Sequence, residues 1–300
     1  MRRLAVVAAA LLTAAGCGSS KPSDDATAAI AFAGAECCGE PEQIPLDIWL
    51  MNEDGSGGRR LTRHPSSERD PRWSPDGHRL VVEAEGALYL VGVDGNDRRQ
   101  LVRAGIHPSW SPTGNLIAFS RDAHGYVIGA DGAGLRRLGD GFPEDWSPDG
   151  KKIAFTRYVG DTSQTHIYVL EADGSGARRV SRPASSDSEA DRSPDGTRIA
   201  FVGVRGTSVV SADVYVMNAD GTGERRLTKF PQGDGECFDD RATGIDWSPD
   251  GEWIAFALKY VGCDKLGDIY LVRPDGNDLR RVTNSGFSVD PAWRPAGRGS

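Results

Sequence analysis

The residues best placed to do chemistry precede a motif, W-S-P-D-G, that the chain repeats six times with small departures. The motif begins at Trp73, Trp110, Trp146, Arg192, Trp247 and Trp293. If each Trp points into packing, the alternation of a strand places the residues one and three positions earlier on a shared face. One position earlier stand Arg72, Ser109, Asp145, Asp191, Asp246 and Ala292. Three positions earlier stand Asp70, His107, Pro143, Glu189, Gly244 and Asp290.

Six of these twelve residues are acids, against one Arg and one His. If the repeats surround an axis, the acids crowd together, so a countercharge and a cationic ligand are expected. That ligand would be a basic peptide segment or a divalent metal. The binding candidates are Asp70, Arg72, His107, Asp145, Glu189, Asp191, Asp246 and Asp290. In the alternative interpretation, Asp70 and Asp290 cap Asp-Pro turns and the other acids accept hydrogen bonds from backbone amides.

No catalytic motif accompanies the acids. The G-x-S-x-G nucleophile elbow is absent, and so are H-E-x-x-H, the P-loop and the Rossmann fingerprint. The five His are scattered along the chain. The chain contains no C-x-x-C motif, so nothing in its cysteine spacing indicates a zinc site. We therefore predict no catalytic residue, no cofactor and no metal ligand. The alternative is an enzyme, a lyase or hydrolase acting on carbohydrate or peptide in a channel along the axis that the repeats surround.

The elements that must position these residues are short strands. Each W-S-P-D-G is a turn, in which Pro sets the first corner and Gly takes the positive φ. A second strand such as Ile153-Ala154-Phe155 follows, then a third such as Ile167-Tyr168-Val169, then an Asp-Gly hairpin turn and a fourth strand that carries an Arg pair. Four antiparallel strands per repeat make one propeller blade, so the sequence predicts an all-β, six-bladed β-propeller.

The two ends of the chain indicate how the ring closes. Ile30-Ala31-Phe32 matches a second strand, yet no first strand precedes it. Asp290-Pro291-Ala292-Trp293 near the C-terminus matches the missing first strand. We therefore expect the last blade to combine three N-terminal strands with one C-terminal strand, which removes an open sheet edge.

Long connections are the second notable feature. They lie at Val159–His166, Val204–Asp213, Phe230–Gly244 and Lys259–Asp268. All fall between second and third strands or between blades, and these two connections leave a meandering blade on the same face. One face of the ring is therefore expected to be elaborated and the other plain.

The repeats resemble those of TolB-type propeller proteins, whose signature is this W-S-P-D-G, I-A-F, I-Y, D-G, L-T pattern. The resemblance covers about Ile30 to Pro295. It implies a propeller fold, and by itself it says little about function, because one fold hosts many functions. TolB carries an additional α/β domain before its propeller, whereas a short tether stands there in this chain, so the resemblance is to the propeller alone.

The first residues look like an export signal. Arg2 and Arg3 precede an apolar stretch from Leu4 to Ala15. Ala14-Ala15-Gly16-Cys17 resembles a lipoprotein lipobox, with Ala14 where Leu is common, and an ordinary secretory signal is the alternative. We predict a signal peptide over 1–16, a lipid-anchored tether over 17–28 beginning at Cys17, and the propeller over 29–296.

Four further cysteines belong to the exported part, where disulfides persist. Cys237 and Cys263 lie in connections expected on one face, so we predict that they form a disulfide. Cys37 and Cys38 lie in the corresponding loop of the next blade, and their pairing stays open.

Charge narrows the choice of partners. The formal net charge is −8, which opposes nucleic-acid binding. The Arg pairs recur once per repeat, so we interpret them as outer-strand residues and not as a basic patch. The sequence thus predicts a monomeric, non-catalytic cell-envelope lipoprotein facing the periplasm or exterior. It would bind a protein or peptide, such as a basic one, and reach the membrane through Cys17.

Overall fold

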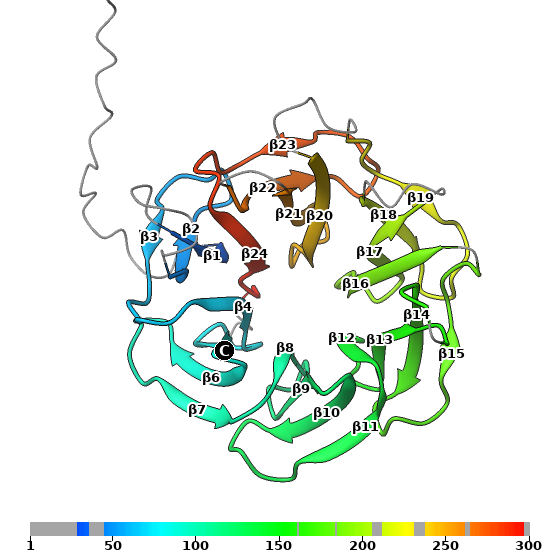
Figure 1. The fold of residues 1–300 in the computed structure, drawn as a ribbon, viewed down its shortest axis with the longest axis horizontal. Helices are drawn as coiled ribbons and strands as arrows, with labels where there is room; N and C mark the ends of the chain where they lie inside the picture. Colours follow the sequence, from blue (N-terminus) through cyan, green and yellow to red (C-terminus); the bar gives the residue numbers. More distant parts are fainter. Residues whose placement is uncertain are drawn as a thin grey trace, which may run out of the picture.

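The structure is a computed structural model that describes residues 29–35, 45–160, 162–183, 185–205, 212–230, 238–261 and 265–296, the side chains of 238–240 and 261 excepted. Its strands form six four-stranded antiparallel sheets arranged as a ring (Figure 1). No helix occurs among the described residues. The predicted all-β, six-bladed propeller is confirmed.

Five blades use consecutive strands. Blade 1 contains β4 (Glu68–Trp73), β5 (Arg79–Ala84), β6 (Ala87–Gly92) and β7 (Arg99–Val102). Blade 2 contains β8 (Ile106–Trp110), β9 (Leu116–Arg121), β10 (His124–Gly129) and β11 (Arg136–Asp140). Blade 3 contains β12 (Phe142–Trp146), β13 (Lys152–Tyr158), β14 (Thr165–Glu171) and β15 (Arg178–Arg179). Blade 4 contains β16 (Ser186–Arg192), β17 (Arg198–Val204), β18 (Asp213–Asn218) and β19 (Arg225–Arg226). Blade 5 contains β20 (Phe238–Trp247), β21 (Ile254–Val261), β22 (Gly267–Val272) and β23 (Arg280–Arg281).

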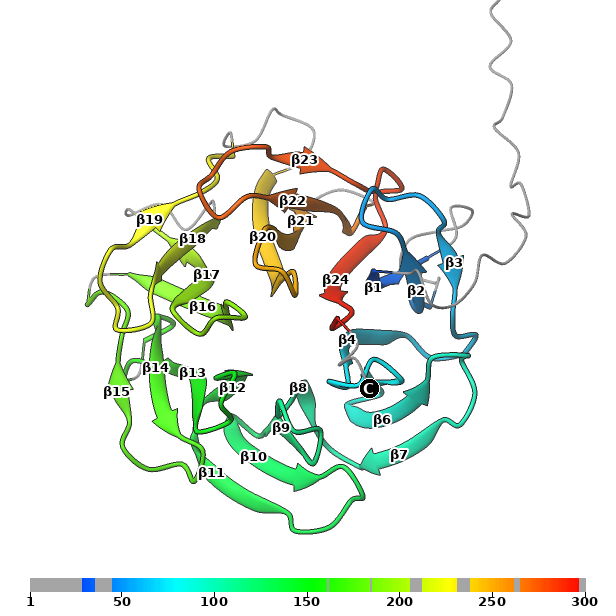
Figure 2. The ribbon, with the colours of Figure 1, turned by 180° about the vertical axis from the view of Figure 1, so that it is seen from behind.

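The sixth blade joins the two ends of the chain, as predicted. It contains β24 (Ser288–Trp293), β1 (Ile30–Gly34), β2 (Asp47–Met51) and β3 (Arg59–Arg60), in that spatial order. Ile30 pairs with Trp293 and Ala31 with Ala292, both antiparallel. Figures 1 and 2 show β24 beside β1 from both sides of the ring. The edge of β1 is therefore covered by the C-terminal strand.

The core lies between neighbouring sheets. The Phe of the second strand is fully buried in four blades, at Phe119, Phe155, Phe201 and Phe256. Each motif Trp is also buried, with at most 7% of its surface exposed. The motif Trp therefore points into the packing between blades, which is the condition that directs the preceding positions toward the axis.

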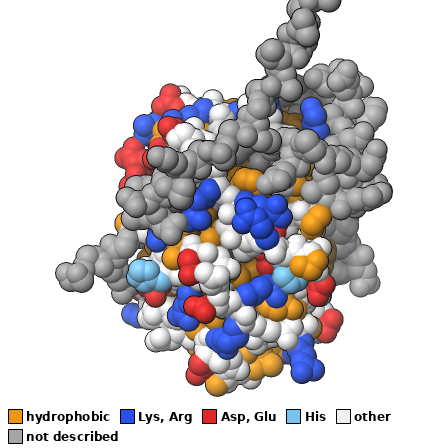
Figure 3. Space-filling model, turned by 90° about the vertical axis from the view of Figure 1, so that its left-hand side faces the viewer, with side chains coloured by type: hydrophobic (Ala, Val, Ile, Leu, Met, Phe, Trp, Pro, Cys, Tyr) orange, Lys and Arg blue, Asp and Glu red, His pale blue; other side chains and the backbone are white. Residues whose placement is uncertain are grey.

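One Arg of the pair contacts the next blade at the perimeter in four blades. Arg136 donates to the carbonyl of Ala172 at 2.8 Å, and Arg178 to that of Asp220 at 3.0 Å. Arg99 and Arg225 make the same contact with the Asp-Gly turn that follows them around the ring. In the side view of Figure 3, basic and acidic side chains are interspersed on the visible, described surface. The pairs are thus outer-strand residues with a defined structural contact.

Candidate functional site

A cavity with a volume of about 980 Å³ follows the axis of the ring. All twelve positions one and three before the motif line it, so the structure brings together Asp70, Arg72, His107, Asp145, Glu189, Asp191, Asp246 and Asp290. The Pro of each motif turn also lines it, namely Pro75, Pro112, Pro148, Pro194, Pro249 and Pro295. The inner strands run in one direction, so the prolines encircle the end at which these strands finish. The bulged positions lie nearer the end at which the strands begin, where the long connections are predicted to lie and which we call the elaborated face.

A β-bulge in every inner strand determines where the side chains three positions before the motif point. These side chains form a ring around the channel, at the bulged positions. The register with the second strand shifts between Arg69 and Arg72 in blade 1, and each other blade has a shift at the matching place. Positive φ angles occur at this position in Asp70, His107, Glu189, Gly244 and Asp290, from 48° to 65°. Four of these five residues are not Gly, and a bulge that holds such residues typically re-aims a side chain.

Blade 3 places Glu144 in this ring, which the sequence analysis missed. Pro143 occupies the bulge position there, and its ring fixes φ at a negative value. The shift in blade 3 falls between Pro143 and Asp145, so Glu144 is the additional residue, and its side chain lines the cavity. The signal was present in the sequence. Blades 1, 2 and 6 carry a polar residue followed by Pro, whereas blade 3 reverses the order to Pro-Glu.

The residues directly before each motif form hydrogen bonds between the inner strands of neighbouring blades, which we call joints. Asp145 accepts a hydrogen bond from the backbone amide of Arg192 at 3.2 Å, and Asp191 accepts one from that of Trp247 at 2.6 Å. Asp246 accepts the corresponding bond from Trp293. The alternative predicted from sequence, bonds to backbone amides, is therefore present at these three acids.

The other three blades make the joint in a second way. Where the residue before the Trp is not Asp, its carbonyl accepts a bond from the indole N–H of the next blade. Trp73 donates to Ala292, Trp110 to Arg72 and Trp146 to Ser109, at 3.2 to 3.3 Å. Six joints of two kinds thus complete the circle, and one carboxylate oxygen of each Asp is committed to structure.

Arg72 supplies the expected countercharge. Its Nη2 lies 3.0 Å from Oδ1 of Asp70. Burial lowers the pKa of Arg72, but the carboxylates of Asp70 and Asp246, followed by Asp191 and Asp290, outweigh burial and raise that pKa. Arg72 therefore stays protonated and holds part of the acidic ring together.

The acids themselves are hard to ionise. Burial raises the pKa of Asp246 to about 7 and that of Asp145 above its ordinary value. Burial, together with the charges of Asp145 and Asp246, raises the pKa of Asp191 well above its ordinary range. Burial also raises the pKa of Glu189, although the amide of Gly244 favours its charged form. The charge of the channel thus depends on pH near neutrality.

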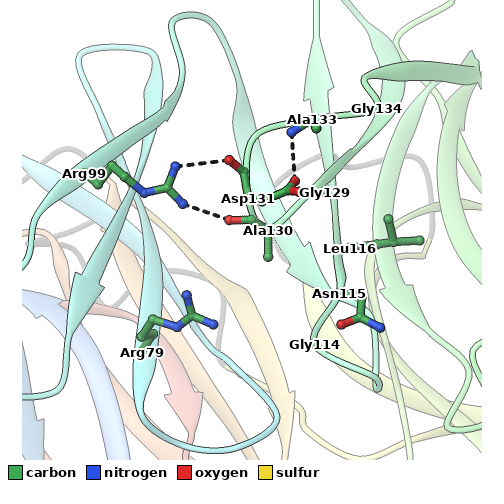
Figure 4. A pocket seen from close by; sticks show the side chains of 10 residues that line it. All are labelled: Arg79, Arg99, Gly114, Asn115, Leu116, Gly129, Ala130, Asp131, Ala133 and Gly134. Carbon is green, nitrogen blue, oxygen red and sulfur yellow. Dashed lines mark hydrogen bonds between the residues drawn. The ribbon is translucent and has the colours of Figure 1, made fainter.

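A second cavity of about 630 Å³ lies between blades 1 and 2 at the perimeter (Figure 4). Its main polar contact joins Arg99 to the carbonyls of Ala130 and Asp131, at 2.8 and 3.4 Å. The same clamp recurs in other blades, so this cavity follows from the repeat and carries no site of its own.

Several predicted features lie outside the described residues, namely Cys17, Cys37, Cys38, Cys237 and Cys263. Within the described ranges, no group of three or more His, Cys, Asp or Glu is arranged to hold a metal ion. No helix in that part of the chain is long and apolar enough to cross a membrane.

Comparison with known proteins places the fold. TolB from Acinetobacter baumannii superimposes with a TM-score of 0.72 and 19% identity, over 90% of this chain and 67% of that one. The structure of a putative TolB from Agrobacterium tumefaciens superimposes with a TM-score of 0.67 and 19% identity, over 90% of this chain and 99% of that one. The chain has the fold of a TolB-type β-propeller.

Enzymes share the architecture at lower similarity. An oligogalacturonate lyase from Vibrio parahaemolyticus gives a TM-score of 0.53 at 11% identity, over 84% of this chain and 78% of that one. Among curated proteins, a dipeptidyl-peptidase 5 from Porphyromonas endodontalis is 34% identical over 68 residues. This match spans 21% of this chain and only 10% of the peptidase. No known protein-family profile matches the chain.

Proposed function

We propose that the protein is a non-catalytic binding scaffold that captures a protein or peptide through its channel and elaborated face. The observation that carries the proposal is the composition of the channel wall. Eight carboxyl groups line the cavity, against four Arg or Lys side chains. Such a wall attracts a positively charged segment and repels an anionic one.

The setting is part of the proposal. We infer an exported lipoprotein of the cell envelope, with a signal peptide over 1–16, a tether over 17–28 and the lipid on Cys17. It would act as a monomer facing the periplasm or exterior, with Cys237 and Cys263 joined as a disulfide. Mass spectrometry of the mature chain tests this setting. A lipidated N-terminal Cys17 peptide and a Cys237–Cys263 peptide under non-reducing conditions are expected.

The binding experiment uses the mature chain as bait in envelope extract. The comparison is a variant carrying Asp145→Asn, Asp191→Asn and Asp246→Asn, which removes three charges and keeps a hydrogen-bond acceptor at each joint. We expect specific partners to be lost from the variant and released from the unchanged protein by salt, because screening weakens the field. If the two proteins capture the same partners, these three carboxylates are not the binding surface, and the other channel acids or the loops of the elaborated face take their place.

A second candidate function is a lyase or hydrolase in the same channel. The observation that favours it is the pair His107 and Glu144, which share the cavity wall and are not held by an ion pair or a backbone amide in the described part of the chain. Burial raises the pKa of Glu144 to about 7, a range suited to proton transfer. Turnover of a saccharide or peptide library that disappears in both His107→Ala and Glu144→Gln supports this candidate.

A further inference from the structure

The ring of bulged positions contains two kinds of side chain. Three are held in place: Asp70 by Arg72 at 3.0 Å, Glu189 by the Thr243 hydroxyl at 2.8 Å, and Asp290, which accepts a bond from the amide of Asp70 at 3.4 Å. His107 and Glu144 lie on the adjacent inner strands β8 and β12. Glu144 has the Thr156 hydroxyl beside it, and no described residue forms an ion pair with either side chain. These two groups are available to a ligand.

An aromatic wall continues from this pair to the rim. The ring of Phe142 lies 6.2 Å from that of His107 and 5.7 Å from that of Tyr158, edge to face in both contacts. Tyr158 is 56% exposed, although it lines the cavity. Exposed aromatic surface at the rim of a cavity is typical of a surface that a ligand covers.

The charges around this wall determine whether a cationic or an anionic ligand is favoured. The acids that face His107 are Asp70, Glu83, Glu144 and Glu189, which come from β4, β5, β12 and β16. Lys259 acts on Glu189 and Arg69 acts on Glu83, so these two basic groups that line the cavity are themselves opposed by acids. An anion would meet several carboxylates here, whereas a cation would meet a carboxylate and aromatic faces together.

We propose that His107, Phe142, Glu144 and Tyr158 form a subsite for an organic cation, the ammonium or guanidinium group of a ligand that enters from the elaborated face. The subsite rests on the proposed binding function and assigns the cation to the rim, away from the Asp joints. Glu144 supplies the ion pair, and Phe142 and Tyr158 supply cation–π contacts. His107 closes the inner side of the subsite and admits the cation only when its imidazole is neutral.

The subsite has a pH dependence of known sign. Burial raises the pKa of Glu144 to about 7, while His107 lowers it and Glu189 and Asp70 raise it. Burial lowers the pKa of His107, but Asp70, Glu144, Glu189 and Glu83 outweigh burial and raise it. As pH rises through about 7, Glu144 gains a negative charge. His107, whose pKa lies above its ordinary value, loses its positive charge at a higher pH than a free imidazole does. Both changes strengthen the binding of a cation that stays protonated as they occur.

The test uses a tetralysine peptide as the probe, with side-chain-acetylated tetralysine as its neutral counterpart, titrated by calorimetry against the mature chain at low salt. We expect Glu144→Gln to weaken tetralysine binding roughly tenfold and Tyr158→Ala roughly threefold. The matched control is Glu252→Gln, which neutralises an exposed perimeter acid paired with Arg273. We expect it to bind as the unchanged protein does. Affinity should rise from pH 6 to pH 8, and most of the rise should be lost in Glu144→Gln.

The outcomes separate the two proposals. If tetralysine binds more tightly than its acetylated form, and Glu144→Gln and Tyr158→Ala bind it as Glu252→Gln does, the subsite is wrong while cation capture by the channel stands. If the unchanged protein does not distinguish the two peptides, cation capture fails and the subsite fails with it. Melting curves of all variants show whether a loss of binding reflects a loss of fold. Tyr158 is exposed and Gln matches Glu in size, so no such loss is expected.

Discussion

At the scale of the residue, the channel acids divide by what their oxygens contact. Asp145, Asp191 and Asp246 each give one oxygen to the backbone of the next blade. Glu144 has neither such a bond nor an ion pair within the described ranges. The three Asp residues therefore contribute to the closure of the ring, whereas Glu144 makes no such contribution. Position in a motif did not reveal this division, because the partner of each acid belongs to a neighbouring repeat.

The joint formed by Asp191 gives the first prediction. Asp191→Ala removes the acceptor and leaves the buried amide of Trp247 without a partner, which costs about 1–3 kcal/mol. Asp191→Asn keeps an acceptor and removes a charge that is costly to bury. We therefore expect Asp191→Ala to lower the melting temperature clearly and Asp191→Asn to keep or raise it. Equal melting temperatures for the two variants would show that the bond does not hold the blades together.

Asp246 gives the second prediction, on pH. Burial raises its pKa to about 7 in the folded protein, against about 3.9 when the chain is unfolded. Between these values the folded state binds more protons than the unfolded state, so the free energy of unfolding falls as pH rises. The contribution is complete below about pH 4 and lost above about pH 7. The pKa values of Asp145, Asp191 and Glu189 are also raised, so these acids change the free energy of unfolding with the same sign.

Melting temperatures at pH 5 and pH 8 check this expectation. The unchanged protein should melt lower at pH 8, and Asp246→Asn should show a smaller difference between the two. A protein that is more stable at pH 8, or a variant with the same pH dependence, would contradict it.

At the scale of the element, the sequence predicted the inner strands and the positions that face the axis. It could do so because the alternation of a strand is a local property repeated in six inner strands, and an apolar Trp marks the buried position in five of them. It missed Glu144 because a rule based on spacing from Trp assumes the same bulge in every blade. Pro143 cannot adopt the positive φ that the bulge uses elsewhere, so the polar side chain moves one position along the strand.

Blade 4 departs from the motif at a buried position, which gives the third prediction. Arg192 replaces Trp there and is 8% exposed, and burial lowers its pKa while Asp145 raises it. Its Nε is buried without a hydrogen-bond partner among the described residues. We expect the amides of β17 and β18 to exchange hydrogen faster than those of β9 and β10 in blade 2. Arg192→Trp should slow that exchange, because an indole restores apolar contact between the blades. Equal protection of the two blades would contradict the expectation.

At the scale of the whole molecule, the ring closes only when the C-terminal strand pairs with the N-terminal ones in blade 6. The joints between inner strands pass from each blade to the next, so the last of them depends on β24. The backbone amide of Trp293 donates a hydrogen bond to Asp246, and the carbonyl of Ala292 accepts one from the indole of Trp73. Without β24 both joints are lost together, and only the packing of β1 and β2 against blades 5 and 1 connects these blades across the gap.

The last prediction follows from that dependence. Deletion of the chain after Phe287 exposes the edge of β1 and removes Val289 and Trp293, which are 1% and 7% exposed. Loss of a buried Trp alone costs about 3–5 kcal/mol, a large part of the roughly 5–15 kcal/mol that holds a domain folded. We expect the truncated protein to show no cooperative melting transition, while a control that lacks only residues 297–300 melts like the full chain. The five complete blades retain their own hydrogen bonds, so circular dichroism of the truncated protein should still report β-structure. A truncated protein that melts cooperatively near the temperature of the control would mean that blades 1 to 5 hold their arrangement without closure, and that the joints around the channel act only between neighbouring pairs.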